Sequence, residues 1–450
     1  MRLKLNNIRA RLTGFRSRQA NVPAPEEAKS EFPLLKHGYD QIVDAARTLS
    51  RSDLNKHLTG DIWEDNFLIN IWEYTHRVPT LESYPWRVYL PIADSCNARC
   101  EFCTSWLYKD LYLQPSALET FSDVLKRAWY IDLCGYGEPL ANPDFAEIVA
   151  TLDQYVDPRS EIVLYSNGAL LDRWITRLLD LGVKRFAFSL NAATSATHDA
   201  VMGLGPKAFD KIIAAIRQLD AVAKDCGKTI YISASFVVTA TNIHEAADFV
   251  ELCNTLPLFG AYLRVLQLTG GHRVLNDLAL PPYLHNRFDE HRARAVAAIN
   301  ASKLQIWASP ENWSLPVLAP ELETLAREKT VPLKTREEIA HTRLVIPDAR
   351  PGGDNIGAVG DLDDFTPTDN PFNRFAPYDC TYPYQTLLVG RTQITPCCFM
   401  NEVPGMEPIK FDGSRPFLEI WNGPQMVRVR KTLGHGPLLR NCMSCPSSRT

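Results

Sequence analysis

The sequence predicts an α/β fold: a partial (βα)6 TIM-like barrel with a mainly helical N-terminal extension and a small C-terminal hairpin-plus-helix unit. Two observations predict the barrel. Short apolar runs rich in β-branched residues recur between residues 86 and 270, and helix-like stretches separate them. Strands that are apolar throughout suit a parallel sheet covered by helices. A third observation, two groups of cysteines near predicted strand ends, concerns function.

The predicted elements follow one another in regular order. The N-terminal part contains a helical pattern at 34–50 and an aromatic group that we expect in the core: Trp63, Phe67, Trp72 and Tyr74. The predicted strands are 87–93, 130–137, 161–168, 185–191, 229–239 and 261–268. The helix-like stretches that alternate with them are 115–128, 143–156, 170–182, 208–227 and 243–256.

These patterns divide the chain into four parts. Residues 1–85 form a basic tail and helical extension, 86–270 the barrel, 271–379 a helical and irregular connection, and 380–450 the C-terminal unit. Pro, Gly and Asp are frequent from 311 onward, which is typical either of a pocket wall or of a flexible linker.

The amino-acid composition limits the classes of protein to which this chain can belong. The 450 residues are 45% hydrophobic and 22% charged with net charge −4, as in ordinary globular proteins. The chain has no overall excess of basic residues that would indicate nucleic-acid binding. It also has no apolar run long enough to cross a membrane, so we expect a cytoplasmic protein without a membrane span. Residues 1–22 carry six basic side chains and no acid. They suit a solvated tail better than a membrane-surface helix or a transit-like peptide.

Three cysteines lie close together directly after the first predicted strand. Cys96, Cys100 and Cys103 have the spacing C-x3-C-x2-C within "ADSCNARCEFCTSW". A disulfide framework belongs to short secreted chains, and structural zinc requires four ligands. Three thiolates suit an iron–sulfur cluster with one iron left open to a ligand. In such barrels the chemistry occurs at the carboxyl ends of the strands, where this loop lies.

Short polar residues and glycines follow the next three predicted strands. Glycines let a backbone approach a ligand closely, and polar side chains recurring at successive strand ends predict a polar cradle. Taken singly, each is equally typical of turns and helix caps. The residues are Gly135, Tyr136, Gly137, Glu138, Ser166, Asn167, Ser189 and Asn191.

The cysteine motif, with Phe102 before its last cysteine, resembles that of the radical S-adenosylmethionine (SAM) superfamily over residues 86 to about 270. "GYGEP" resembles that family's Gly-Gly-Glu motif, with Tyr136 in place of a glycine. "YSNG" and "SLN" resemble its ribose- and carboxylate-contacting strand ends. The resemblance implies a [4Fe–4S] cluster on Cys96, Cys100 and Cys103 whose open iron binds SAM. It further implies that SAM is contacted by Phe102 and by seven of the strand-end residues. These are Tyr136, Gly137, Glu138, Ser166, Asn167, Ser189 and Asn191.

A second group of cysteines lies near the C-terminus. Four thiolates can complete the ligand set of either a zinc ion or a [4Fe–4S] cubane, and the spacing does not distinguish the two. The candidates are Cys380, Cys397 or Cys398, Cys442 and Cys445. The region resembles the SPASM/twitch extension of radical SAM enzymes, which implies an auxiliary [4Fe–4S] cluster. Within that pattern Cys397, after the strand-ending proline, is the fourth ligand.

The resemblance implies reductive cleavage of SAM to a 5′-deoxyadenosyl radical that abstracts hydrogen from a small substrate, with sugar-like molecules as candidates. The auxiliary cluster would accept an electron, so the enzyme would be an oxidoreductase served by a flavodoxin or ferredoxin. Two alternatives stay open: a peptide-modifying maturase, and a non-catalytic metal-binding scaffold. Neither the substrate nor a catalytic proton acceptor can be named from the sequence.

Overall fold

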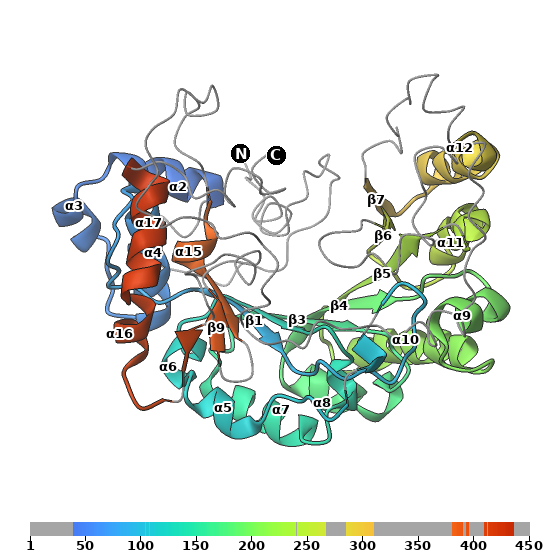
Figure 1. Cartoon of the computed structure of the whole chain (residues 1–450), viewed down its shortest axis with the longest axis horizontal. Coiled ribbons are helices and arrows are strands. Elements are labelled where there is room, and N and C mark those ends of the chain that lie inside the picture. Colours follow the sequence, from blue (N-terminus) through green and yellow to red (C-terminus); the bar gives the residue numbers. More distant parts are fainter. Residues whose placement is uncertain are drawn as a thin grey trace, which may run out of the picture.

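The computed structural model describes residues 39–103, 105–107, 109–239, 241–266, 285–309, 380–389, 393–395, 409–411 and 413–435. Within them a single curved sheet runs through the molecule, in the order β10-β9-β8-β1-β2-β3-β4-β5-β6-β7 (Figure 1). Its strands are β1 (Arg87–Pro91), β2 (Tyr130–Cys134), β3 (Glu161–Ser166), β4 (Val183–Ser189), β5 (Tyr231–Val238), β6 (Gly260–Val265), β7 (Gln305–Ser309), β8 (Thr386–Val389), β9 (Gln393–Thr395) and β10 (Ile409–Lys410).

The partial barrel is confirmed, and it is larger than expected. All six predicted strands pair in parallel in chain order, and β7 and β8 add a parallel strand at each side. The sequence pattern misses β7 because this five-residue strand follows a long connection and helix α12. It places β8 in a separate C-terminal unit, whereas β8 pairs with β1 through Arg87 and Thr386, and β9 folds back on β8 antiparallel.

Helices cover the convex side of the sheet. In chain order they are α5 (Pro115–Glu119), α6 (Ser122–Leu125), α7 (Phe145–Tyr155), α8 (Ile175–Asp180), α9 (Ser195–Met202), α10 (Ala208–Asp225), α11 (Ala246–Cys253) and α12 (His285–Ala301). Short 3-10 turns lie at Ser105–Leu107, Pro139–Ala141, Leu171–Arg173 and Ile243–Glu245. The predicted helix 115–128 is divided into α5 and α6, and α9 was not predicted.

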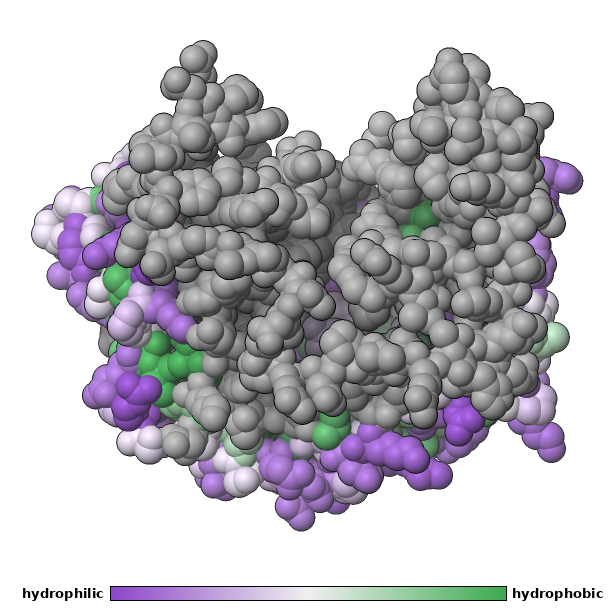
Figure 2. Space-filling model, viewed as in Figure 1, coloured by the Kyte–Doolittle hydropathy of each residue, from purple (hydrophilic) through white to green (hydrophobic). Residues whose placement is uncertain are grey.

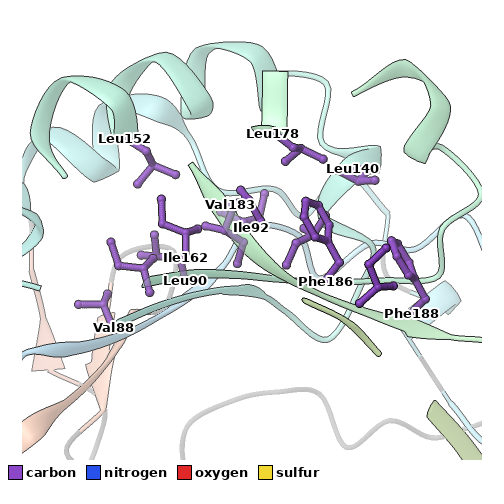
Figure 3. Packing of buried hydrophobic residues seen from close by; sticks show 14 of the residues in the cluster. Val88, Leu90, Ile92, Leu140, Leu152, Ile162, Leu178, Val183, Phe186 and Phe188 are labelled. Atoms are coloured by element: carbon purple, nitrogen blue, oxygen red, sulfur yellow. The ribbon is translucent and has the colours of Figure 1, made fainter. Parts of the chain in front are cut away.

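Strand alternation separates a helix-covered core from the concave face. Every second side chain of β1 to β4 points toward the helices and is buried, as Figure 3 shows for Val88, Leu90, Ile162, Phe186 and Phe188. The intervening positions therefore face the inside of the partial barrel. Hydrophilic residues line the outer edge of the molecule beyond the helices (Figure 2).

The N-terminal helices α2 (Tyr39–Thr48), α3 (Arg51–Asn55) and α4 (Ile62–Thr75) lie against the amino ends of β2 and β3. Trp63 stacks on Trp129 with ring centroids 3.7 Å apart, and its indole Nε1 donates to the carbonyl of Ala128 at 2.9 Å. Trp63, Phe67 and Tyr74 are buried as expected, while Trp72 is half-buried. This extension therefore packs at the amino ends of the strands, away from the carboxyl ends where the cysteine loop begins.

The C-terminal helices join the same side of the molecule (Figure 1). They are α15 (Tyr382–Gln385), α16 (Phe417–Trp421) and α17 (Pro424–His435). Arg430 of α17 is fully buried, and its guanidinium donates to the carbonyls of Pro79, Pro383 and Trp421. A buried charged donor that reaches three segments of chain fixes α17 against α15 and the loop before β1.

Candidate active site

The three-cysteine loop begins where β1 ends, at the carboxyl edge of the sheet. The chain continues past β1 in extended form: Ile92 N donates to Cys134 O at 2.8 Å, and Ala93 pairs with Tyr112. Cys96, Cys100 and Cys103 follow as three half-buried cysteines. The loop therefore lies at the rim, where a parallel α/β barrel places its chemistry.

Each thiol has its own surroundings. Cys96 Sγ accepts from the Ala98 N–H at 3.4 Å, and Cys103 Sγ accepts from the Ser105 N–H at the same distance. Cys100 Sγ lies 3.4 Å from Met202 Sδ. Burial raises the pKa of the Cys96 thiol to about 11, and the neighbouring Cys103 adds to the increase.

The turn after β2 packs directly on the cysteine loop. Gly137 N donates to Ala93 O at 2.8 Å, and Glu138 N donates to Ser95 O at 3.1 Å. A Cβ on Gly135 would lie 2.3 Å from Ala93 O, and one on Gly137 would lie 2.0 Å from Ser95 O. The missing side chains of Gly135 and Gly137 therefore make room for the backbone that leads to Cys96.

Tyr136 lies between these glycines and points outward. Its side chain is 77% exposed, which makes it one of the exposed large hydrophobic residues of the described chain. Its carbonyl oxygen accepts a hydrogen bond from the hydroxyl of Ser105, whose own N–H donates to Cys103 Sγ. Ser105 thus ties the glycine turn to the third cysteine.

Glu138 is buried and is held by the protein itself. Its Oε1 accepts from Ser166 Oγ at 2.7 Å and from Leu140 N at 3.1 Å, and its Oε2 accepts from Asn167 N at 2.7 Å. Burial raises its pKa to about 7, although these hydrogen bonds favour the charged form. With both oxygens engaged, Glu138 acts as a positioning residue that joins the ends of β2 and β3.

Asn167 extends this connection to the cysteine loop. Its Nδ2 donates to Asn97 Oδ1 at 2.8 Å and lies 3.9 Å from Cys96 Sγ. Ser166 accepts from Gly168 N as well as donating to Glu138, so its hydroxyl serves the turn. The structure therefore brings Glu138, Ser166 and Asn167 together beside Cys96.

The end of β4 reaches the same loop from the other side. Asn191 has a left-handed backbone with φ of 55° and is buried. Its Oδ1 accepts from Val237 N at 2.7 Å, and its Nδ2 contacts Met202 Sδ at 3.0 Å. Ser189 is half-buried on the concave face, 3.4 Å from Ser235 Oγ. Asn191 thus joins β4 and β5 to the support of Cys100.

The remaining predicted residues are more scattered. Phe102 is half-buried within the loop. Cys380 is half-buried just before α15 and packs on the main core. Cys397, Cys398, Cys442 and Cys445 lie outside the described residues, as do the N-terminal tail and 311–379. Among the other described cysteines, Cys253 is buried, Cys134 is half-buried, and Cys226 is exposed at the end of α10.

The donor set of the loop suits an iron–sulfur cluster. The three cysteines lie within eight residues of a rim loop, and thiolates select such clusters over hard metals. In the described part of the chain no three Cys, His or acidic side chains converge on one point as a ready metal site. The loop therefore supplies the ligand chemistry of such a cluster, although its three sulfurs do not meet at one point in this structure.

Sequence reasoning overlooked two supports of this loop. Ser105 follows the motif and has no signal of its own. Helix α9 has ordinary signals: Thr194 caps its first turn by accepting from Thr197 N, and Gly203 ends it in the left-handed conformation. A Thr before and a Gly after an eight-residue stretch predict a helix, which the weak apolar pattern of "SATHDAVM" conceals.

Comparison with known proteins supports the assignment of an iron–sulfur cluster to the cysteine loop. Residues 90–252 match the model of the Radical SAM superfamily. A GTP 3′,8-cyclase 1 of Mycobacterium tuberculosis is 28% identical over 191 residues, which are 40% of this chain and 51% of that relative. An AdoMet-dependent heme synthase of Nitratidesulfovibrio vulgaris is 27% identical over 207 residues, or 44% and 52% of the two chains. The chain spans about half the length of these curated relatives.

Among solved structures, Streptococcus suis SuiB bound to S-adenosylmethionine has a similar fold. The TM-score is 0.50 with 14% identity, and the match covers 91% of this chain and 85% of SuiB. No helix in the described ranges has the length and apolar character needed to cross a membrane. The matched residues contain the cysteine loop and the strand ends that surround it, and we conclude that residues 90–252 form a radical SAM domain.

Proposed function

We propose that this radical SAM enzyme oxidises a small polar substrate, with sugar-like molecules as first candidates. When bound, SAM and its cluster supply a 5′-deoxyadenosyl radical for hydrogen abstraction. Cys96, Cys100 and Cys103 would hold that cluster. The strand ends at Glu138, Asn167 and Asn191 would fix the loop that carries it.

The observation that carries the proposal is the character of the concave face below the rim. Ser189, Ser233 and Ser235 occupy alternating positions of β4 and β5, opposite buried Phe186, Phe188 and Ala234. Beside them Tyr262 and Trp307 stack with centroids 4.5 Å apart and an interplanar angle of 11°. Small hydroxyls next to a flat aromatic wall suit a ring-shaped polar molecule better than an apolar one.

The test uses the reconstituted chain, SAM and a low-potential reductant such as reduced flavodoxin or ferredoxin. We expect deuterium from ring-deuterated aminocyclitols or sugars to appear in 5′-deoxyadenosine, together with a product two electrons more oxidised. Ser235→Val should lower that transfer while unstimulated SAM cleavage continues. Deuterium transfer from peptides alone would instead identify a peptide-modifying enzyme.

An auxiliary [4Fe–4S] cluster on Cys380, Cys397, Cys442 and Cys445 would receive the second electron. With four protein ligands such a cluster has no open iron, so it would not bind SAM. The double variant Cys442→Ala/Cys445→Ala should therefore lose about four irons per chain and should no longer form oxidised product, while SAM cleavage partly survives. Zinc in this place, with a single cubane overall, would contradict the oxidoreductase assignment.

A further inference from the structure

Helix α9 supports the middle of the cysteine loop. Arg99 N donates to Met202 O at 2.8 Å, and Glu101 N donates to Val201 O at 2.9 Å. These two bonds lie on either side of Cys100, so the last turn of α9 and the loop run side by side. The position of Cys100 relative to α9 is thus fixed by the backbone, whichever rotamer its side chain adopts.

Met202 places its thioether against Cys100 from this helix. Its side chain is 1% exposed, and Sδ lies 3.4 Å from Cys100 Sγ. Asn191 Nδ2 contacts the same Sδ at 3.0 Å, and Asn191 is itself held by Val237 N and by Asn242 Nδ2. A flexible methionine is therefore restrained at both ends, by its helix and by the ends of β4 and β5.

The contact between Met202 and Cys100 bears on redox chemistry. Backbone N–H groups donate to Cys96 and Cys103, and the large thioether of Met202 lies against Cys100. Hydrogen bonds to cluster sulfurs and exposure to water both influence the reduction potential of an iron–sulfur cluster. Water and N–H donors stabilise the more negative, reduced form, and so they raise the potential.

We propose that Met202 is a positioning residue that shields the Cys100 sulfur from water and keeps the cluster a strong reductant. The inference rests on the proposed function, because it takes Cys100 as a cluster ligand. It assigns α9 a role in electron transfer to SAM, through the contact between Met202 and Cys100. The cluster needs a low potential because the reduced form must donate an electron to the sulfonium.

The experiment compares Met202→Leu, Met202→Gln and Met202→Ala in the full chain, reconstituted with iron and sulfide. Leucine keeps an apolar side chain of similar volume, glutamine brings an N–H donor, and alanine admits water. The readouts are iron content, the midpoint potential of the cluster whose EPR signal changes on adding SAM, and 5′-deoxyadenosine formation. Met426→Gln, at a fully buried position of α17, is the matched control.

We expect the glutamine and alanine variants to shift the midpoint to a more positive potential and to slow 5′-deoxyadenosine formation with dithionite about tenfold. A stronger reductant such as titanium(III) citrate should restore most of the rate. Met202→Leu and Met426→Gln should retain the wild-type potential. If Met202→Gln fails to load iron, Met202→Ala carries the same comparison.

Unchanged potentials in all Met202 variants would overturn the inference, and so would iron loss without a shift, since that is a purely structural effect. An equal shift in Met426→Gln would overturn it as well. Cys100→Ala separates this failure from that of the proposed function. If Cys100→Ala keeps its SAM-responsive cluster, the ligand assignment is wrong; if it loses the cluster while Met202 variants keep their potential, only the role of Met202 is refuted.

Discussion

Replacing any one of Cys96, Cys100 and Cys103 by alanine is expected to abolish formation of 5′-deoxyadenosine. A cubane left with two protein ligands is labile, and the rim loop offers no other thiol in the described chain to replace the lost one. We expect the rate of SAM cleavage to fall by at least about 100-fold. Loss of a residue that only supports a metal ligand typically costs up to about 100-fold, and loss of a ligand should cost more. Anaerobic reconstitution followed by chromatographic quantification of 5′-deoxyadenosine measures it.

Cys226→Ala provides the matched control for this prediction. Cys226 is also a free cysteine, but it is exposed at the end of α10, and its loss should leave iron content and SAM cleavage unchanged. The ligand assignment would be wrong if all three rim variants retained substantial SAM cleavage. Circular dichroism of each variant separates the loss of the cluster from the loss of the fold.

Gly137→Val is expected to damage the cysteine loop as well as SAM binding. Any Cβ at this position would lie 2.0 Å from Ser95 O and 2.5 Å from Ser95 C, which are backbone atoms and cannot swing aside. The β2 turn must then separate from residues 93–95, with loss of the bond from Gly137 N to Ala93 O. Overpacking against rigid backbone should cost about 3 kcal/mol of folding free energy or more.

The measurement for Gly137→Val is cluster absorbance and thermal stability, with Gly182→Ala as control. Gly182 has a positive φ of 84°, but a Cβ added there would meet nothing within 4 Å, so that variant reports backbone strain alone. We expect the control to keep its cluster and lose only about 1 kcal/mol of stability. A Gly137→Val chain with normal cluster absorbance and weakened SAM binding would show instead that the glycine faces the ligand.

Local patterns in the sequence sufficed for most of the barrel. The six predicted strands contain β-branched and aromatic residues at buried positions such as Val88, Ile162 and Phe186, so periodicity located them correctly. The strand ends were also located, because parallel strands bring their carboxyl ends to one edge. These predictions depend only on short-range pattern and on general topology.

The uses of the site residues could not be predicted in the same way. Whether Glu138 faces a ligand or its own neighbours depends on where Ser166 and Asn167 lie in space. The role of Gly137 depends on how closely residues 93–95 approach it. Met202 carries no chemical signal at all, since a methionine on a short helix is normally a core residue. Such roles arise from packing between segments far apart in the chain.

The pairing of β8 with β1 has a consequence for how the protein is made. During synthesis β1 and its cysteine loop emerge well before β8, with β2 available as a neighbour on one side. The other edge of β1 pairs with β8, through Arg87 and Thr386, so it stays open until β8 has been synthesised. Contacts this distant in sequence are slow to form, and an unpaired strand edge is prone to aggregation. The strand that presents the three cysteines therefore gains its second neighbour only after β8 has been synthesised, and we expect iron and sulfide to be delivered to the loop after that point.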